Sequence, residues 1–338
     1  MTSAGMGVGD AAGFHRLRAD TATLKADLQR LTHELSTGVR SDLGAASGGV
    51  FDTLSHITRS LTLSRSYLDG ITMASLDGEA RQTALGQVEA QLSAAAPGLL
   101  NFATSGSLDN LHTANQNAGE RFAHAVGSLN TQIAGRSLFA GDALDQPATV
   151  SAEDMLVELR VLASTATTAA DLITSVEDWF MTPGGGYETT AWQGGTGTAP
   201  PVVLGEGRQE DVSVTALDPA IREGLVGLAL AALVEENSGP TGEADVRDLL
   251  SHASERMMSG ERSVIGLRAD LGARQGLVDE ARAETETSRA ALEIERTRLM
   301  EADPYRTATD LEAAQTQLES LYVLTARLSR LTLTEYLR

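Results

Sequence analysis

Leucines recur at heptad spacing near both ends of the chain, and this pattern limits what the chain can fold into. The N-terminal set lies within residues 14–37 and comprises Leu17, Leu24, Leu28, Leu31 and Leu35. From Leu24 onward the spacing is that of a coiled-coil seam, which is narrower than the apolar stripe of a globular helix. We therefore expect a first helix that ends at Gly38 and packs against a helical partner.

A similar stripe marks the last predicted helix. The dipeptide Asp303-Pro304 ends the preceding helix, because the residue before a proline is disfavoured in the helical conformation. Thr309 and Glu312 predict a capping box near the start of the last helix. Its apolar positions are Leu311, Ala314, Leu318, Leu321, Leu324, Leu328 and Leu331. A chain that runs out and returns would pack this stripe antiparallel to the first one.

Two thin seams would leave apolar flanks uncovered, among them Phe14, Leu324 and Leu333. Such flanks favour packing against further copies of the chain or into a similar helical array, with an ordinary intramolecular bundle as the alternative. The predicted assembly interface comprises Leu17, Leu24, Leu28, Leu31, Leu35, Leu311, Leu318, Leu321, Leu324, Leu328, Leu331 and Leu333.

The rest of the chain is predicted to be mainly α, with long antiparallel helices in coiled-coil or bundle packing built from both ends and a small mixed α/β insert in the middle. A rod seam continues loosely to Pro97, and residues 107–138 look helical up to Gly135. Residues 202–217 carry the only convincing β signal, two short strands about a turn. Helices are then expected over 220–236, 243–258 and 261–301.

These patterns predict five segments. They are an N-terminal assembly helix (1–45), a helical rod segment (46–138), a variable middle insert with short helices and a β-hairpin (139–219), a returning rod segment (220–302) and a C-terminal assembly helix (303–338).

Composition excludes several classes of protein. The net charge of −20 argues against nucleic-acid binding, which needs a basic surface. There is no cysteine, so neither disulfides nor thiolate metal sites can form. We find no signal peptide at the start, and the longest apolar block, residues 225–234, is about half of a membrane span. We therefore expect a soluble protein.

No catalytic pattern emerges from the sequence. No two histidines lie at the helical spacings that metal ligands use. The histidines are His15, His33, His56, His112, His124 and His252. Neither a phosphate-binding loop nor a nucleophile elbow is present. We predict no enzyme activity and no catalytic, cofactor or metal residues. Trp179 and Trp192 could line a ligand site. We prefer the simpler interpretation that they anchor the insert, which has little other core.

Three stretches resemble flagellin-family axial proteins. They are LKADLQRLTHELSTGVRSD (24–42), NTQIAGRSLFAGDALDQPA (130–148), and RADLGARQGLVDEAR with ERTRLMEADPYRTATDLEAAQTQLESLYVLTARLSRLTLTEYL (268–282 and 295–337). The phrase Leu-Phe-Ala-Gly-Asp and the ending LSRLTLTEYLR look like the hook–filament junction branch of the family, the hook-associated proteins, rather than filament flagellin.

The resemblance implies a structural part of the bacterial flagellum, a junction layer between hook and filament built by self-assembly of the terminal helices. It implies an extracellular location reached by flagellar type III export without a cleaved signal. The implied partners are further copies of the chain, a neighbouring hook-associated protein, flagellin and an export chaperone, with neither nucleic acid nor membrane. Filament flagellin, or a soluble helical module that binds a ligand through residues 182–217, are the alternatives.

Overall fold

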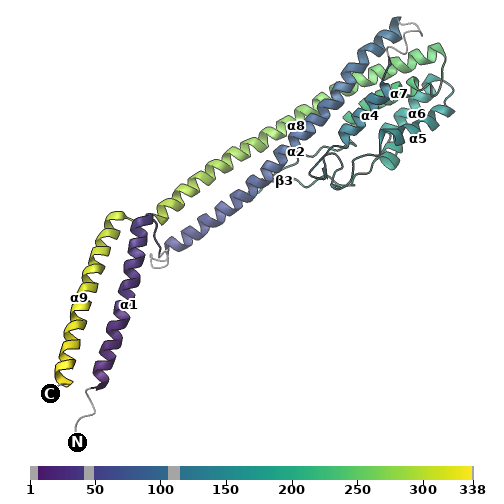
Figure 1. The fold of residues 1–338 in the computed structure, drawn as a ribbon. Helices are drawn as coiled ribbons and strands as arrows, with labels where there is room; N and C mark the ends of the chain where they lie inside the picture. Colours follow the sequence, from purple (N-terminus) through teal and green to yellow (C-terminus); the bar gives the residue numbers. More distant parts are fainter. Residues whose placement is uncertain (1–6, 42–48, 106–114, 337–338) are drawn as a thin grey trace. The chain divides into compact units, whose positions relative to one another are not determined.

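The computed structural model describes residues 7–41, 49–105 and 115–336. The helices are α1 (Gly7–Thr37), α2 (Gly49–Ser105), α4 (Ala118–Leu129), α5 (Ala152–Thr165), α6 (Ala169–Met181), a π-helix (Tyr187–Ala191), α7 (Pro219–Glu235), α8 (Glu243–Met300) and α9 (Pro304–Tyr336). The strands are β1 (Gln132–Ile133), β2 (Arg136–Ser137), β3 (Val202–Gly205) and β4 (Arg208–Glu210). The predicted class, mainly helical with a small mixed insert, is confirmed (Figure 1).

Contacts within the chain divide it into two units. The terminal unit comprises residues 1–63 and 287–338, and the middle unit comprises residues 64–286. Each unit is described by itself below.

Helix α7 forms the centre of the middle unit. Its side chains are buried almost all round, from Ile221 to Val234, as expected for a core helix rather than an amphipathic surface helix. Helices α4, α5 and α6 pack against it. None of the described helices is long and apolar enough to cross a membrane. The apolar block at 225–234 is therefore explained by burial inside the protein.

Short polar caps start the helices around α7. The Ser151 hydroxyl accepts a hydrogen bond from the Asp154 backbone N–H at 3.2 Å and starts α5. Thr168 and Asp171 form a reciprocal capping box at the start of α6. The Asp218 carboxylate accepts from the Ala220 N–H at 2.9 Å and starts α7. These local signals fix where the helices of the insert begin.

The predicted hairpin in residues 202–217 is confirmed as β3 and β4, which pair antiparallel with Val202 opposite Glu210. Leu204 and Val212 pack against α2 at Ile71 and against α8 at Val278. One face of the hairpin is therefore held on the long helices of the middle unit.

The prediction of helix up to Gly135 was wrong in part. Residues 107–114 lie outside the described residues, and α4 ends at Leu129. Strands β1 and β2 follow, so residues 202–217 do not contain the only β structure. Ala134 and Gly135 both have positive φ, 49° and 77°, which is the geometry of a two-residue hairpin turn. Alanine rarely adopts a positive φ, so the sequence does not predict this turn.

Two predicted helix boundaries were also wrong. Helix α2 continues through Pro97 to Ser105, and α8 is one helix from Glu243 to Met300 where two had been expected. Beyond Pro97, Leu99 and Phe102 are buried, and this packing outweighs the backbone hydrogen bond that proline cannot make. Tertiary contacts therefore override the local helix-breaking signals.

Gly260, near the predicted break in α8, is where α8 touches α7. A Cβ at Gly260 would lie 2.5 Å from the Cα of Gly224. A Cβ at Gly227 would lie 2.6 Å from the Ala253 carbonyl oxygen. Backbone blocks the space in both cases, so these glycines allow the two helices to pack closely.

We predict that Gly260→Ala destabilises the middle unit by about 1–3 kcal/mol, because the added methyl must push α7 and α8 apart. Gly276→Ala is the matched control on the same helix, since a Cβ there meets no atom within 4 Å. It should be neutral or stabilising, by up to about 1 kcal/mol. Urea unfolding followed by circular dichroism measures both, and equal midpoints for the two variants would contradict the proposed contact.

Candidate assembly interface at the chain ends

Helices α1 and α9 lie side by side and antiparallel in the terminal unit (Figure 1). The predicted pairing of the first helix with the last is confirmed. Residues about 300 positions apart in sequence therefore form one helical pair, as expected for a chain that runs out and returns.

The end of α1 is formed by Gly38. Its φ of 70° is left-handed, and its N–H donates to the Glu34 carbonyl oxygen at 2.8 Å. Glycine adopts this conformation without the steric cost that a side chain would add. The predicted helix end at Gly38 is therefore confirmed.

Backbone hydrogen bonds join the end of α1 to the connection before α9. The Arg40 N–H donates to the Met300 carbonyl oxygen at 2.8 Å, and the Ala302 N–H donates to the Gly38 carbonyl oxygen at 2.9 Å. These bonds fix the register in which α1 and α9 start to run alongside each other.

Helix α9 is capped differently from the prediction. The Asp303 carboxylate accepts from the N–H groups of Tyr305 and Arg306 at 3.0 and 3.2 Å, and Pro304 occupies the first helical position. The Thr309 hydroxyl donates to the Tyr305 carbonyl oxygen at 2.9 Å, within the helix. The predicted capping box at Thr309 was wrong, because Asp303-Pro304 both ends α8 and starts α9.

The seam between α1 and α9 is only partly covered. On α1, Leu31 is buried with 7% of its surface exposed, whereas three other leucines of the predicted seam are half-buried. Those three are Leu17, Leu24 and Leu28. On α9, the half-buried leucines are Leu311, Leu318 and Leu321. A pair of helices covers each seam from one side only.

Other predicted interface residues lie off this seam. Leu35 is 41% exposed, and its neighbour Glu34 is buried in its place. Leu324 is 52% exposed. The side chains of Phe14, Leu328, Leu331 and Leu333 lie outside the described residues. Among the described residues, the predicted set therefore divides into a partly buried seam within the pair and two exposed leucines, Leu35 and Leu324.

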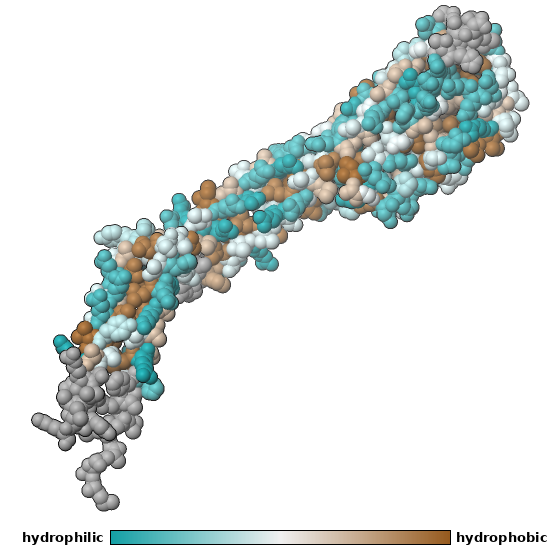
Figure 2. Space-filling model, in the orientation of Figure 1, coloured by the Kyte–Doolittle hydropathy of each residue, from teal (hydrophilic) through white to brown (hydrophobic). Residues whose placement is uncertain are grey.

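Tyr322, Val323 and Leu324 form an apolar strip on α9, each about half exposed. The sequence predicts only Leu324, because Tyr322 and Val323 fall outside the heptad pattern of the leucines. Lys25 of α1 lies with its Nζ 5.9 Å from the centre of the Tyr322 ring. Figure 2 shows hydrophobic surface among polar side chains over this helical pair.

Charged side chains support α1 at its C-terminal end. Arg30 donates to Asp27 at 3.1 Å and to Glu34 at 3.3 Å, and the Ser41 N–H also donates to Glu34 at 2.9 Å. The hydrogen bond to Asp27, followed by the one to Glu34, raises the pKa of Arg30 although partial burial opposes the rise. Glu34 thus joins its own helix to the chain that follows.

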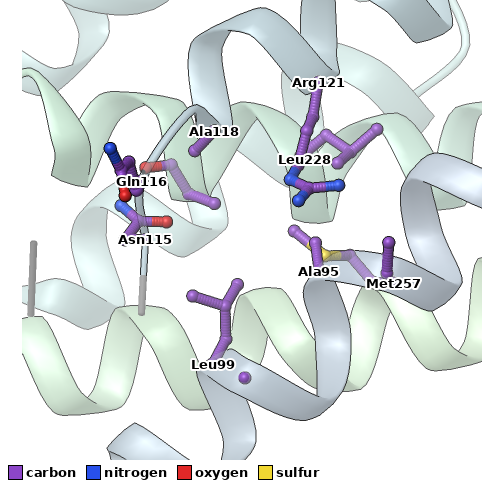
Figure 3. Close-up of a pocket in the computed structure, with 11 residues that line it drawn as sticks. Ala95, Leu99, Asn115, Gln116, Ala118, Arg121, Leu228 and Met257 are labelled. Carbon is purple, nitrogen blue, oxygen red and sulfur yellow. Dashed lines mark hydrogen bonds between the residues drawn. The ribbon is translucent and has the colours of Figure 1, made fainter. Parts of the chain in front are cut away.

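The described residues bring together no cluster of histidine, aspartate and glutamate that could hold a metal ion. A hollow of about 230 Å³ lies between α2, α4, α7 and α8 (Figure 3). Its polar groups come from Asn115, Gln116 and Arg121, and the amide of Asn115 donates to the Ala231 carbonyl oxygen at 2.7 Å. Amides and a guanidinium supply neither a nucleophile nor a general base.

Both tryptophans anchor the insert. Trp179 donates to Glu158 at 3.1 Å and stacks edge-on against Phe180, with ring centres 4.6 Å apart. Trp192 donates to the Gly195 carbonyl oxygen at 3.3 Å. The buried Tyr187 packs beside Trp179. The anchoring interpretation is confirmed, because these rings form part of the core.

Comparison with known proteins supports the resemblance seen in the sequence. Residues 262–337 match the family of the bacterial flagellin C-terminal helical region. The fold is similar to the structure of a putative flagellar hook-associated protein from Vibrio parahaemolyticus, with a TM-score of 0.52 and 16% identity, covering 72% of this chain and 94% of that chain. No match to a curated protein is found by sequence. The family match supports the resemblance of the C-terminal region to flagellins, and the structural match shows a shared fold.

We predict that Leu31→Ala loosens the α1–α9 pair by about 2 kcal/mol, because it removes the most buried side chain of the seam. Leu35→Ala, one turn later and exposed, should change it by less than about 0.5 kcal/mol. The measurement is hydrogen exchange of residues 305–327 in each purified variant. Equal exchange in the two variants would mean that Leu31 does not hold the helices together.

Proposed function

We propose that this chain, which carries a flagellin-type C-terminal helical region, is a structural component of the bacterial flagellum. In this proposal it forms a layer between hook and filament, and its terminal helices assemble with those of other copies. Its neighbours would be another hook-associated protein on one side and flagellin on the other. The chain would act outside the cell after type III export with a chaperone, and would have no catalytic role.

The incomplete burial of the α1–α9 seam carries this proposal. Half-buried leucines lie along both helices, and Tyr322, Val323 and Leu324 of α9 are each about half exposed. This pair leaves its seam leucines half-buried, and further helices packed against it would cover their remaining surface. Additional copies of the same pair would supply those helices. The twelve leucines predicted from the sequence are the proposed interface, with Tyr322 and Val323 added to them.

Sequence resemblance and fold both favour the junction role over the filament role. It is supported by the resemblance of residues 130–148 and of the chain end to junction proteins, and by the fold shared with a hook-associated protein. The flagellin C-terminal family match is compatible with either role. Filament flagellin therefore remains the second candidate within the same structural class.

Deletion of residues 311–338 tests the assembly role. We expect the shortened chain to stay soluble, because the core around α7 lies in the middle unit, but to be missing from purified flagella. Immunoblots of purified flagella and of the culture medium separate failed incorporation from failed export. A shortened chain that still incorporates would contradict the proposal.

A subtler variant keeps the helix intact. Replacing Val323 and Leu324 together by glutamate should cut incorporation by tenfold or more, because the charges would have to be buried against neighbouring copies. The matched control replaces the exposed polar residues Thr316 and Ser320 of the same helix by glutamate and should incorporate normally. Equal incorporation of the two variants would exclude the strip from the interface.

Copy number separates the two flagellar roles. A junction layer requires a small fixed number of subunits in each flagellum, whereas a filament requires thousands. Quantitative mass spectrometry of purified flagella, with labelled peptides from this chain, gives the ratio to other flagellar proteins. A chain that makes up most of the filament mass would exclude the junction role and favour filament flagellin.

A further inference from the structure

A groove of about 580 Å³ opens in the middle unit, between α2, the β1–β2 hairpin and the segment that leads into β3. We call it the β3 groove and define it by six of its lining residues: Tyr67, Gly70, Arg81, Ser137, Pro200 and Pro201. Its volume falls within the range of sites that bind small molecules, roughly 300–1,000 Å³. The proposed assembly role makes no use of it.

The walls of the groove are apolar and firmly held. Tyr67 and Met73 line it from α2, and residues 200–203 line it from the opposite side. Leu204, directly after that segment, is buried against α2 and α8. A wall held by core packing keeps its shape, which favours a preformed site over a transient gap between loops.

A buried cation lies in the lining of this groove. Arg81 is only 5% exposed, and its Nε donates to the Leu138 carbonyl oxygen at 2.9 Å. None of the ion pairs among the described residues involves Arg81. Burial lowers the pKa of Arg81, opposed in part by the charge of Asp77. A buried charge without an ion-pair partner is costly, so an anion at this point would be stabilising.

Ser137 supplies a second unused group beside Arg81 in the groove lining. Its hydroxyl is buried, 3% of the residue is exposed, and its Oγ has no hydrogen-bond partner among the described residues. Buried hydroxyl groups are nearly always hydrogen-bonded in folded proteins. A guanidinium and a free hydroxyl in one lining match the two oxygens of a carboxylate, which arginine binds with particular strength.

The surrounding charges limit the ligand to one negative charge. Arg136 also lines the groove, but so does Asp77, and Asp211 is close enough to affect Arg81. Asp211 already accepts hydrogen bonds from the N–H and hydroxyl of Ser213. The two arginines and two aspartates leave no net positive charge around the groove, which favours a singly charged ligand over a doubly charged phosphate.

We propose that the β3 groove binds a small monocarboxylate with an apolar body. Its carboxylate would meet Arg81 and Ser137, and its apolar part would lie between Tyr67 and the two prolines, Pro200 and Pro201. This proposal is independent of the flagellar role, and it gives a specific site to the sequence-based alternative that the insert holds a ligand.

Isothermal titration calorimetry on the full chain tests the proposal, with 3-phenylpropionate and octanoate as probes. We expect saturable binding with one site per chain. The neutral 3-phenylpropanamide, which has the same apolar body, should bind at least tenfold more weakly because it cannot pair with Arg81. Equal binding of the acid and the amide would overturn the assignment of the carboxylate to Arg81.

Two variants locate the site. Gly70→Leu should abolish binding by filling the groove, and it should fold normally because a Cβ at Gly70 meets no atom within 4 Å. Gly266→Leu, equally free of contacts but on α8 away from the groove, is its control. Arg81→Met should weaken binding of the acids at least tenfold, whereas Arg262→Met, at an exposed arginine of α8, should not.

The proposal fails if neither acid binds the full chain, or if Gly70→Leu binds them as well as Gly266→Leu does. Should Arg81→Met not fold, Gly70→Leu still decides the outcome. A capped peptide, acetyl-Phe-Glu-Phe-amide, is the remaining probe. If it binds while both free acids do not, the groove accepts a protein segment, and the small-ligand proposal is overturned.

Discussion

The pairing of α1 with α9 is the contact on which the terminal unit depends. It joins the two ends of the chain through heptad leucines, and backbone hydrogen bonds between residues 38–40 and 300–302 set its register. A two-stranded pair is narrow, so most seam leucines stay half-buried. The terminal unit therefore forms a defined pair of helices while leaving apolar surface exposed along both of them.

The middle unit buries its apolar side chains within one copy of the chain, whereas the terminal unit leaves many of them partly exposed. Leucines of α7, such as Leu225 and Leu228, are fully buried, and glycines let α8 approach α7 closely. Nothing similar surrounds Leu17 or Leu318, each of which is half-buried. This difference separates a self-contained folded body from a helical pair suited to assembly. The two properties fit a subunit that folds in one part and polymerises through the other.

Much of the fold followed from local signals in the sequence. The heptad leucines predicted α1, α9 and their pairing, and Gly38 marked the end of α1. The prediction failed where tertiary packing decides: Pro97 lies inside α2, and Gly260 lies within α8 because close contact with α7 requires a glycine there. Leu35 was assigned to the seam because periodicity alone cannot show that Glu34 is buried instead.

The β3 groove could not have been predicted from the sequence, since Arg81, Ser137 and Pro200 come from three distant segments. No motif joins them, and only the fold brings a guanidinium without an ion pair and a hydroxyl without a hydrogen bond into one lining. The apolar strip at residues 322–324 was missed in part for a simpler reason. Its members are consecutive, and consecutive apolar residues do not follow a heptad pattern.

Hydrogen exchange on the purified monomer tests the central claim most directly, by comparing residues 14–37 and 305–327 with residues 221–234 of α7. The account predicts weak but measurable protection in the two terminal helices and strong protection in α7, because among these three segments only α7 is fully buried in a single copy. Equal, strong protection in all three segments would contradict it. That result would mean that the α1–α9 pair is stable alone and needs no further copies.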